Sequence, residues 1–108
     1  MKRGEIWTVS GGPGYAGKPR PTLVVQSDLA DTPSVLTCGF TTQASIDVPL
    51  RPLIQPSPEN GLFRPSNLMS EKITSVPRER LGRRVGVLSA ADIARADGAM
   101  RLVMGFAE

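Results

Sequence analysis

The sequence has 108 residues, of which 40% are hydrophobic, and a formal net charge of +3. This length suits one domain covering residues 1–108, which can bury roughly 65% of the surface that the unfolded chain exposes, enough for a core without disulfides or a structural metal. The chain has no histidine and a single cysteine, Cys38. These counts exclude Ser-His-Asp and Cys-His catalysis, histidine-ligated zinc and an internal disulfide, while the basic excess favours polyanionic partners.

The beginning of the sequence does not resemble a signal peptide. Residues 1–5 (MKRGE) run directly into strand-like sequence, and no apolar run approaches the roughly 20 residues that a membrane span needs. We therefore expect a cytoplasmic protein that does not interact with membranes.

Short strands separated by connections rich in glycine and proline account for most of the chain. The β-branched and apolar residues predict strands at 4–9, 22–26, 35–42, 46–50, 68–76 and 83–88. Residues 51–67 contain four prolines and the pair Asn60-Gly61. That composition predicts a long, mobile connection without further regular core structure.

The periodicity changes near the C-terminus, where it predicts a helix. Ser89 stands three residues before Asp92, the spacing of a helix-capping box, and apolar residues follow at intervals of three and four, at Ile93, Ala96 and Met100. Five or six short strands followed by one helix predict a mainly β fold. We expect a small, strongly bent antiparallel barrel that is closed by the C-terminal helix.

Arg20 is the first candidate functional residue, because Pro19 and Pro21 flank it at the entrance to the predicted 22–26 strand. Proline fixes its own φ and restricts the residue before it, so Arg20 has little backbone freedom. A guanidinium held in this way suits a phosphate or a carboxylate, which it binds in a planar fork. The alternative is a structural arginine that pairs with a nearby Asp or Glu.

Two further residues could share a groove with Arg20, and a third could stack on a base. The Thr41 hydroxyl would face the same groove if the 35–42 and 22–26 strands are paired, although threonine is also common in strands for its β-propensity alone. Glu71 is a candidate groove carboxylate that could accept a proton or orient Arg20, whereas a solvated position on an outer strand explains it equally well. Tyr15, in a glycine-rich loop, could stack on a base.

Four segments of the sequence, taken in order, resemble the MazF/PemK family of toxin endoribonucleases. They are residues 2–7 (KRGEIW), 17–28 (GKPRPTLVVQSD), 40–43 (FTTQ) and 70–76 (SEKITSV), the last followed by Arg80-Leu81. Each segment is moderately specific by itself. Their order and spacing hold across nearly the whole chain, which makes the combined resemblance strong.

The resemblance implies an SH3-like barrel of the MazF/CcdB-like toxin type, assembled as a homodimer. It also implies metal-independent, cofactor-free cleavage of single-stranded RNA at short sequences, as in the mRNA interferases, and neutralisation by a cognate antitoxin with a disordered acidic tail. By the same resemblance Arg20 and Thr41 correspond to the catalytic arginine and threonine, and Glu71 to an acidic groove residue. The residues expected to contact RNA are Tyr15, Lys18, Thr42, Gln43 and Lys72.

This chemistry needs none of the residue types that the chain lacks. The ribose 2′-hydroxyl is the nucleophile, so the protein has only to align it and stabilise the phosphorane, with Arg20 and Thr41 binding the non-bridging oxygens. The general base stays open between Glu71 and a guanidinium tuned by its neighbours. Two other functions also stay open: a gyrase-poisoning toxin of the same fold that binds its target through the C-terminal helix, and a non-catalytic SH3-like barrel that binds nucleic acid or a peptide.

Overall fold

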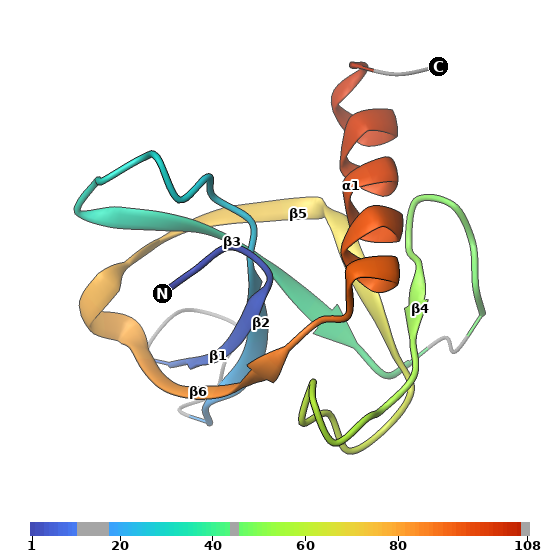
Figure 1. The fold of residues 1–108 in the computed structure, drawn as a ribbon, viewed down its shortest axis with the longest axis horizontal. Coiled ribbons are helices and arrows are strands. Elements are labelled where there is room, and N and C mark those ends of the chain that lie inside the picture. Colours follow the sequence, from blue (N-terminus) through green and yellow to red (C-terminus); the bar gives the residue numbers. More distant parts are fainter. Residues whose placement is uncertain (11–17, 44–45, 107–108) are drawn as a thin grey trace.

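The computed structural model describes residues 1–10, 18–43 and 46–106 (Figure 1). In these residues, six strands form one antiparallel sheet in the order β4-β5-β3-β2-β1-β6. The strands are β1 (Glu5–Val9), β2 (Arg20–Val24), β3 (Ser34–Thr41), β4 (Leu53–Ile54), β5 (Ser66–Pro77) and β6 (Leu81–Val87). A 3₁₀ turn (Arg78–Arg80) joins β5 to β6, and the helix α1 (Ala90–Met104) follows. The sheet curls into a half-barrel because β6 pairs with β1, and α1 stands against one side of it (Figure 1).

The curled sheet carries an apolar cluster on each face. Neighbouring residues along a strand point to opposite faces, so Leu23 and Val24 of β2 belong to different clusters. The cluster of Leu23 lies between the sheet and α1 and includes Ala96 and Met100 of the helix. The cluster of Val24 lies on the other face and includes Val9, Val35, Val76 and Leu81. Burial on both faces explains why the apolar residues 23–25 follow one another without alternating with polar residues.

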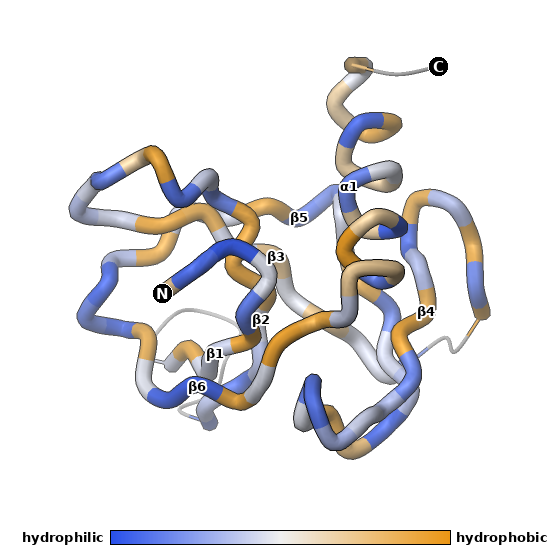
Figure 2. Tube along the Cα trace, in the orientation of Figure 1, coloured by the Kyte–Doolittle hydropathy of each residue, from blue (hydrophilic) through white to orange (hydrophobic). Residues whose placement is uncertain are grey.

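The helix begins as the sequence predicts. The Ser89 hydroxyl accepts a hydrogen bond from the Asp92 backbone N–H at 3.1 Å, which caps the first turn. Figure 2 shows the apolar stretch that leads from the end of β6 into α1, where Leu88 is buried. The helix ends at Gly105, whose φ of 78° lies in the left-handed region that favours glycine. The last apolar residues of the helix stay exposed, namely Leu102, Val103 and Met104.

Two predictions about the middle of the chain are wrong. Residues 46–50 do not form a strand, and their one ladder contact among the described residues is an isolated bridge between Val48 and Arg51. Residues 51–67, expected to be a mobile connection, contain β4 and place Ile54 and Leu62 in the core. The reason is pairing across a long loop, because β4 pairs antiparallel with the start of β5, and residues 55–65 lie between the two strands.

The other strands lie where the sequence predicts them, with shifted ends. β2 begins two residues earlier than expected, at Arg20, because the backbone at that position pairs with Val9 of β1. β5 extends beyond both of its predicted limits, and β6 begins two residues earlier and ends one residue earlier than predicted. Within the described residues, no helix has the length and apolar character needed to cross a membrane.

Candidate active site

Arg20 and Thr41 lie at adjacent ends of two paired strands. β2 begins at Arg20 and β3 ends at Thr41. The antiparallel register places Thr22 opposite Gly39, and continuing it by two residues along each strand leads to Arg20 and Thr41. Residues opposite each other in an antiparallel pair share a face of the sheet, so the register directs both side chains to one face. On its other side, Thr41 pairs with Asn67 of β5.

Both side chains are accessible, and no described residue engages the Arg20 guanidinium. The Arg20 side chain is exposed and makes no hydrogen bond or ion pair with any residue of the described ranges. The structural alternative, an arginine paired with a nearby carboxylate, is therefore not observed there. Thr41 is half-buried, and its Oγ1 accepts a hydrogen bond from the Gln43 backbone N–H at 3.3 Å. The hydroxyl proton of Thr41 thus remains available for donation to a ligand.

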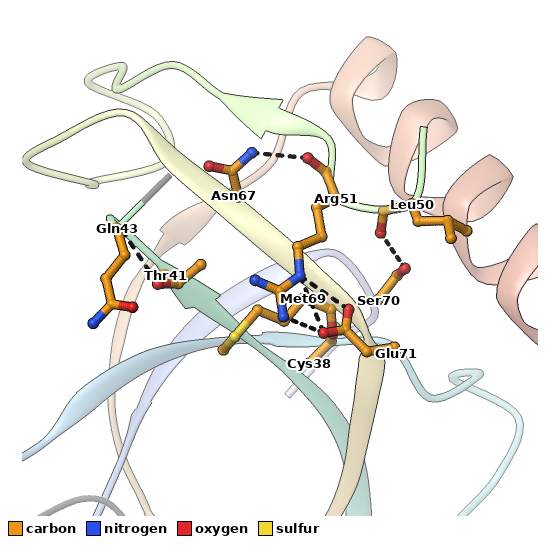
Figure 3. A network of polar contacts seen from close by, with 9 residues as sticks. All are labelled: Cys38, Thr41, Gln43, Leu50, Arg51, Asn67, Met69, Ser70 and Glu71. Atoms are coloured by element: carbon orange, nitrogen blue, oxygen red, sulfur yellow. Dashed lines mark hydrogen bonds and ion pairs between the residues drawn. The ribbon is translucent and has the colours of Figure 1, made fainter. Parts of the chain in front are cut away.

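Glu71 has a different partner from the one that the sequence suggested. Its two carboxylate oxygens accept hydrogen bonds from Nε of Arg51 at 3.2 and 3.0 Å, and the Arg51 Nη2 closes the ion pair (Figure 3). The hydrogen bonds from Arg51 hold the pKa of Glu71 below its ordinary value. A carboxylate held in this way is ionised at neutral pH and is a weak proton acceptor.

Side chains of β5 hold the 46–52 loop against the sheet. Nδ2 of Asn67, which is almost fully buried, donates to the Ile46 carbonyl at 2.7 Å and to the Arg51 carbonyl at 2.8 Å. The Ser70 hydroxyl donates to the Leu50 carbonyl (Figure 3). Together with the Arg51 ion pair, these bonds fix the loop beside the end of β3.

The remaining predicted RNA contacts divide into three groups. Lys18, Gln43 and Lys72 are exposed near the strand ends or on β5. Thr42 is also exposed, and it borders a pocket of about 460 Å³ on the face of the sheet opposite to that of Arg20. Tyr15 lies outside the described residues.

Sequence reasoning did not identify Arg51, Asn67 or Ser70. The only sequence signal of Arg51 is a lone charge before a proline, and polar residues on a predicted strand are ordinarily solvated.

In the described part of the chain, no three His, Cys, Asp or Glu side chains come together in a way that could hold a metal ion.

The sequence model of a protein family, the PemK-like, MazF-like toxins of type II toxin–antitoxin systems, matches residues 2–104 of this chain. The chain belongs to this family, which confirms the resemblance seen in its motifs. Among curated proteins, it is similar to a probable endoribonuclease MazF of Mycolicibacterium smegmatis, with 45% identity over 109 residues that cover 99% of both chains. It is also 34% identical over 112 residues to the endoribonuclease MazF9 of Mycobacterium tuberculosis, which covers 94% of each.

Solved structures confirm the expected fold class. An endoribonuclease from a mycobacterial species, in complex with its cognate antitoxin, superposes with a TM-score of 0.81 at 19% identity, covering 100% of this chain and 98% of that chain. MazF from Deinococcus radiodurans gives a TM-score of 0.75 at 19% identity, covering 97% and 96%. At this identity the likeness establishes the half-barrel with its C-terminal helix.

Proposed function

We propose that this protein cuts single-stranded RNA between Arg20 and Thr41, by attack of the ribose 2′-hydroxyl on the adjacent phosphate. Family membership and two curated endoribonuclease relatives make the chain an endoribonuclease toxin and do not favour the gyrase-poisoning alternative. The observation that carries the proposed site is the position of a guanidinium and a hydroxyl proton, both without a partner among the described residues, at adjacent ends of β2 and β3.

The proposed reaction is a transesterification. The 2′-oxygen forms a bond to phosphorus, the bond from phosphorus to the 5′-oxygen breaks, and the 2′ proton passes to a base while the leaving 5′-oxygen gains a proton. The products are a 2′,3′-cyclic phosphate and a 5′-hydroxyl. Arg20 stabilises the charge on the non-bridging oxygens and Thr41 donates one further hydrogen bond to them.

In this proposal Glu71 belongs to the site as the anchor of Arg51. The pKa of Glu71 lies below its ordinary value because Arg51 binds the ionised form, which disfavours proton uptake by this carboxylate. Anchoring of Arg51 fixes the 46–52 loop, and Asn67, which binds the same loop, pairs with Thr41. Glu71 thereby supports the wall of the site on the side of Thr41.

The proposed partners follow from the exposed charges and the apolar end of the helix. Lys18 and Lys72, together with Arg20, offer exposed cations to a disordered acidic antitoxin segment, which would compete with RNA. A structure of similar fold, an endoribonuclease in complex with its cognate antitoxin, supports an antitoxin as partner. The exposed end of α1, Leu102 to Met104, supports a homodimer. The cytoplasm, where single-stranded RNA is abundant, is the proposed place of action.

The test is incubation of the purified protein with RNA in excess EDTA. Arg20→Ala should lower the cleavage rate about 150-fold or more, since removal of one donor to the transition state costs roughly 3 kcal/mol. Thr41→Ala should reduce the rate by a smaller factor. Arg80→Ala, which removes another exposed arginine, serves as the control and should cut at the normal rate.

Two results would overturn the proposed site. One is cleavage at normal rates by a correctly folded Arg20→Ala variant. The other is RNA binding without turnover by the unmodified protein, which would instead support the non-catalytic barrel. Because Arg20 is exposed and has no partner among the described residues, the thermal midpoint of Arg20→Ala should match that of the unmodified protein. Measuring this midpoint shows whether a loss of cleavage comes from misfolding.

A further inference from the structure

A second pocket lies close to the proposed catalytic pair, on the other face of the sheet. It has a volume of about 460 Å³, and its walls include Pro19 and Pro21 of the β2 entrance and Thr42 at the end of β3. These residues are the immediate neighbours in sequence of Arg20 and Thr41. A nucleic-acid strand that leaves the catalytic pair over the strand ends therefore reaches this pocket next.

The most exposed aromatic side chain of the described residues stands at this pocket. Phe63 is 98% exposed, and its neighbour Leu62 is 8% exposed and packed in the core. The loop before it is held by Asn60, whose side-chain oxygen accepts from the backbone N–H groups of Ser57 at 3.0 Å and Leu62 at 2.9 Å. The exposure of Phe63 is therefore imposed by a well-bonded loop.

The same loop is pressed against β6, where close packing leaves no room for a side chain. Gly61 has a φ of 70°, and a Cβ at that position would lie 2.5 Å from the Val85 carbonyl oxygen. The Val87 backbone N–H also donates to the Glu59 carbonyl at 2.9 Å. The loop and β6 thus form one wall of the pocket, and Figure 1 shows the loop beside the end of β6.

Two guanidinium groups at the pocket have no compensating charge in the described part of the chain. The side chains of Arg64 and Arg83 make no hydrogen bond or ion pair there. The next residue along β6, Arg84, points to the other face and binds Glu5 at 2.9 Å. The pocket therefore combines an aromatic ring on a well-bonded loop with two cations that no described residue pairs.

We propose that this pocket binds a nucleotide that flanks the scissile phosphate, with its base on Phe63 and its phosphate on Arg83 and Arg64. The inference rests on the proposed function and extends it to a subsite for the substrate. An aromatic face stacks on any base, and a guanidinium binds phosphate in a planar fork. An acidic peptide would use the two cations but would leave the ring without a partner, so RNA is the better match.

The experiment measures binding separately from cleavage. The probe is a fluorescein-labelled 2′-O-methyl oligoribonucleotide of randomised sequence, about 12 nucleotides long, a length within the range that single-strand-binding domains cover. It cannot undergo attack by a 2′-hydroxyl, so its anisotropy reports affinity alone. The control for Phe63→Ala is Leu29→Ala, because Leu29 is 96% exposed and lies in the turn between β2 and β3.

Phe63→Ala should weaken binding about tenfold, as expected for the loss of one stacked base, and Leu29→Ala should leave it unchanged. Arg83→Ala should weaken binding about fivefold and reduce the slope of log affinity against log salt by about 0.7, as expected for the loss of one phosphate contact to a single strand. Arg80→Ala is the matched control and should change neither quantity.

Unchanged affinity of Phe63→Ala for the probe would overturn the inference. So would a selective loss of binding to a polyglutamate peptide, which would assign the pocket to the antitoxin instead. The outcome is distinguishable from failure of the proposed function: a protein that binds the probe through Phe63 but does not cut unmodified RNA loses the catalytic assignment and keeps the subsite. A protein that cuts RNA, but whose Phe63→Ala variant binds the probe normally, keeps the catalytic assignment and loses the subsite.

Discussion

Replacement of Glu5 by Gln tests the ion pair between Glu5 of β1 and Arg84 of β6. Oε1 of Glu5 accepts hydrogen bonds from the Lys2 backbone N–H at 2.8 Å and from the Trp7 indole N–H at 3.1 Å, and Oε2 accepts from Nε of Arg84 at 2.9 Å. Burial by itself would raise the pKa of this carboxyl. The three donors outweigh burial and lower the pKa of Glu5 to about 2.

The size and sign of the effect follow from that pKa. A fall from the ordinary 4.5 to about 2 corresponds to roughly 3 kcal/mol of folding free energy at 1.36 kcal/mol per unit. Because the Arg84 side chain is half exposed, solvent screening reduces the expected value to about 2 kcal/mol. The pKa is lowered in the folded state, so this stability is present above about pH 4.5 and is lost as the pH falls toward 2.

The assay is urea unfolding of the unmodified protein and of Glu5→Gln at pH 7 and pH 3. The difference in unfolding free energy should be about 2 kcal/mol at pH 7 and should fall below half of that at pH 3. Glu79→Gln, at an exposed glutamate of the 3₁₀ turn, is the control and should change stability by less than about 0.5 kcal/mol at both pH values. An equal difference for Glu5→Gln at pH 7 and pH 3 would refute the reasoning.

Three other outcomes follow from single contacts. Ser89→Ala removes the hydrogen bond that caps α1 and should cost about 1 kcal/mol in urea unfolding with an unchanged m-value; a cost near zero would contradict the capping role. Burial, and then the charge of Glu71, raise the pKa of the Cys38 thiol to about 12. Iodoacetamide at pH 8 should therefore label Cys38 only after unfolding, and rapid labelling of the folded protein would show that the thiol is accessible. Asn67→Ala removes the Nδ2 donor from the Ile46 and Arg51 carbonyls and should lower the unfolding free energy by about 2 kcal/mol. The same variant should also cut RNA more slowly, and full activity would show that the 46–52 loop does not support the site.

The sequence predicts most of the strands and the helix because their signals are local. The N-cap at Ser89 and the apolar spacing after it depend only on neighbouring residues; the Ser89 hydroxyl caps the helix, and Ala96 and Met100 are buried on its inner face. The pairing of the Arg20 and Thr41 strands follows from the register of β2 and β3, whose apolar runs are long enough to be recognised in the sequence.

The 46–67 region could not be predicted, because its structure depends on β5. β4 has only two residues, and the turn before it is held by side chains that are distant in sequence, such as Asn67. The partner of Glu71 is inaccessible to sequence reasoning for the same reason, since Arg51 is twenty residues away and precedes a proline. Phe63 and Arg83 meet at one pocket only because the loop is pressed against β6.

The pairing of β1 with β6 has a consequence for how the toxin is made. Residues 5–9 find one of their two neighbours only when residues 81–87 have been synthesised, so a growing polypeptide keeps an unsatisfied β-edge until translation is nearly over. Contacts between such distant segments form slowly. The six-stranded sheet is therefore complete only after residues 81–87 have left the ribosome and β6 has paired with β1.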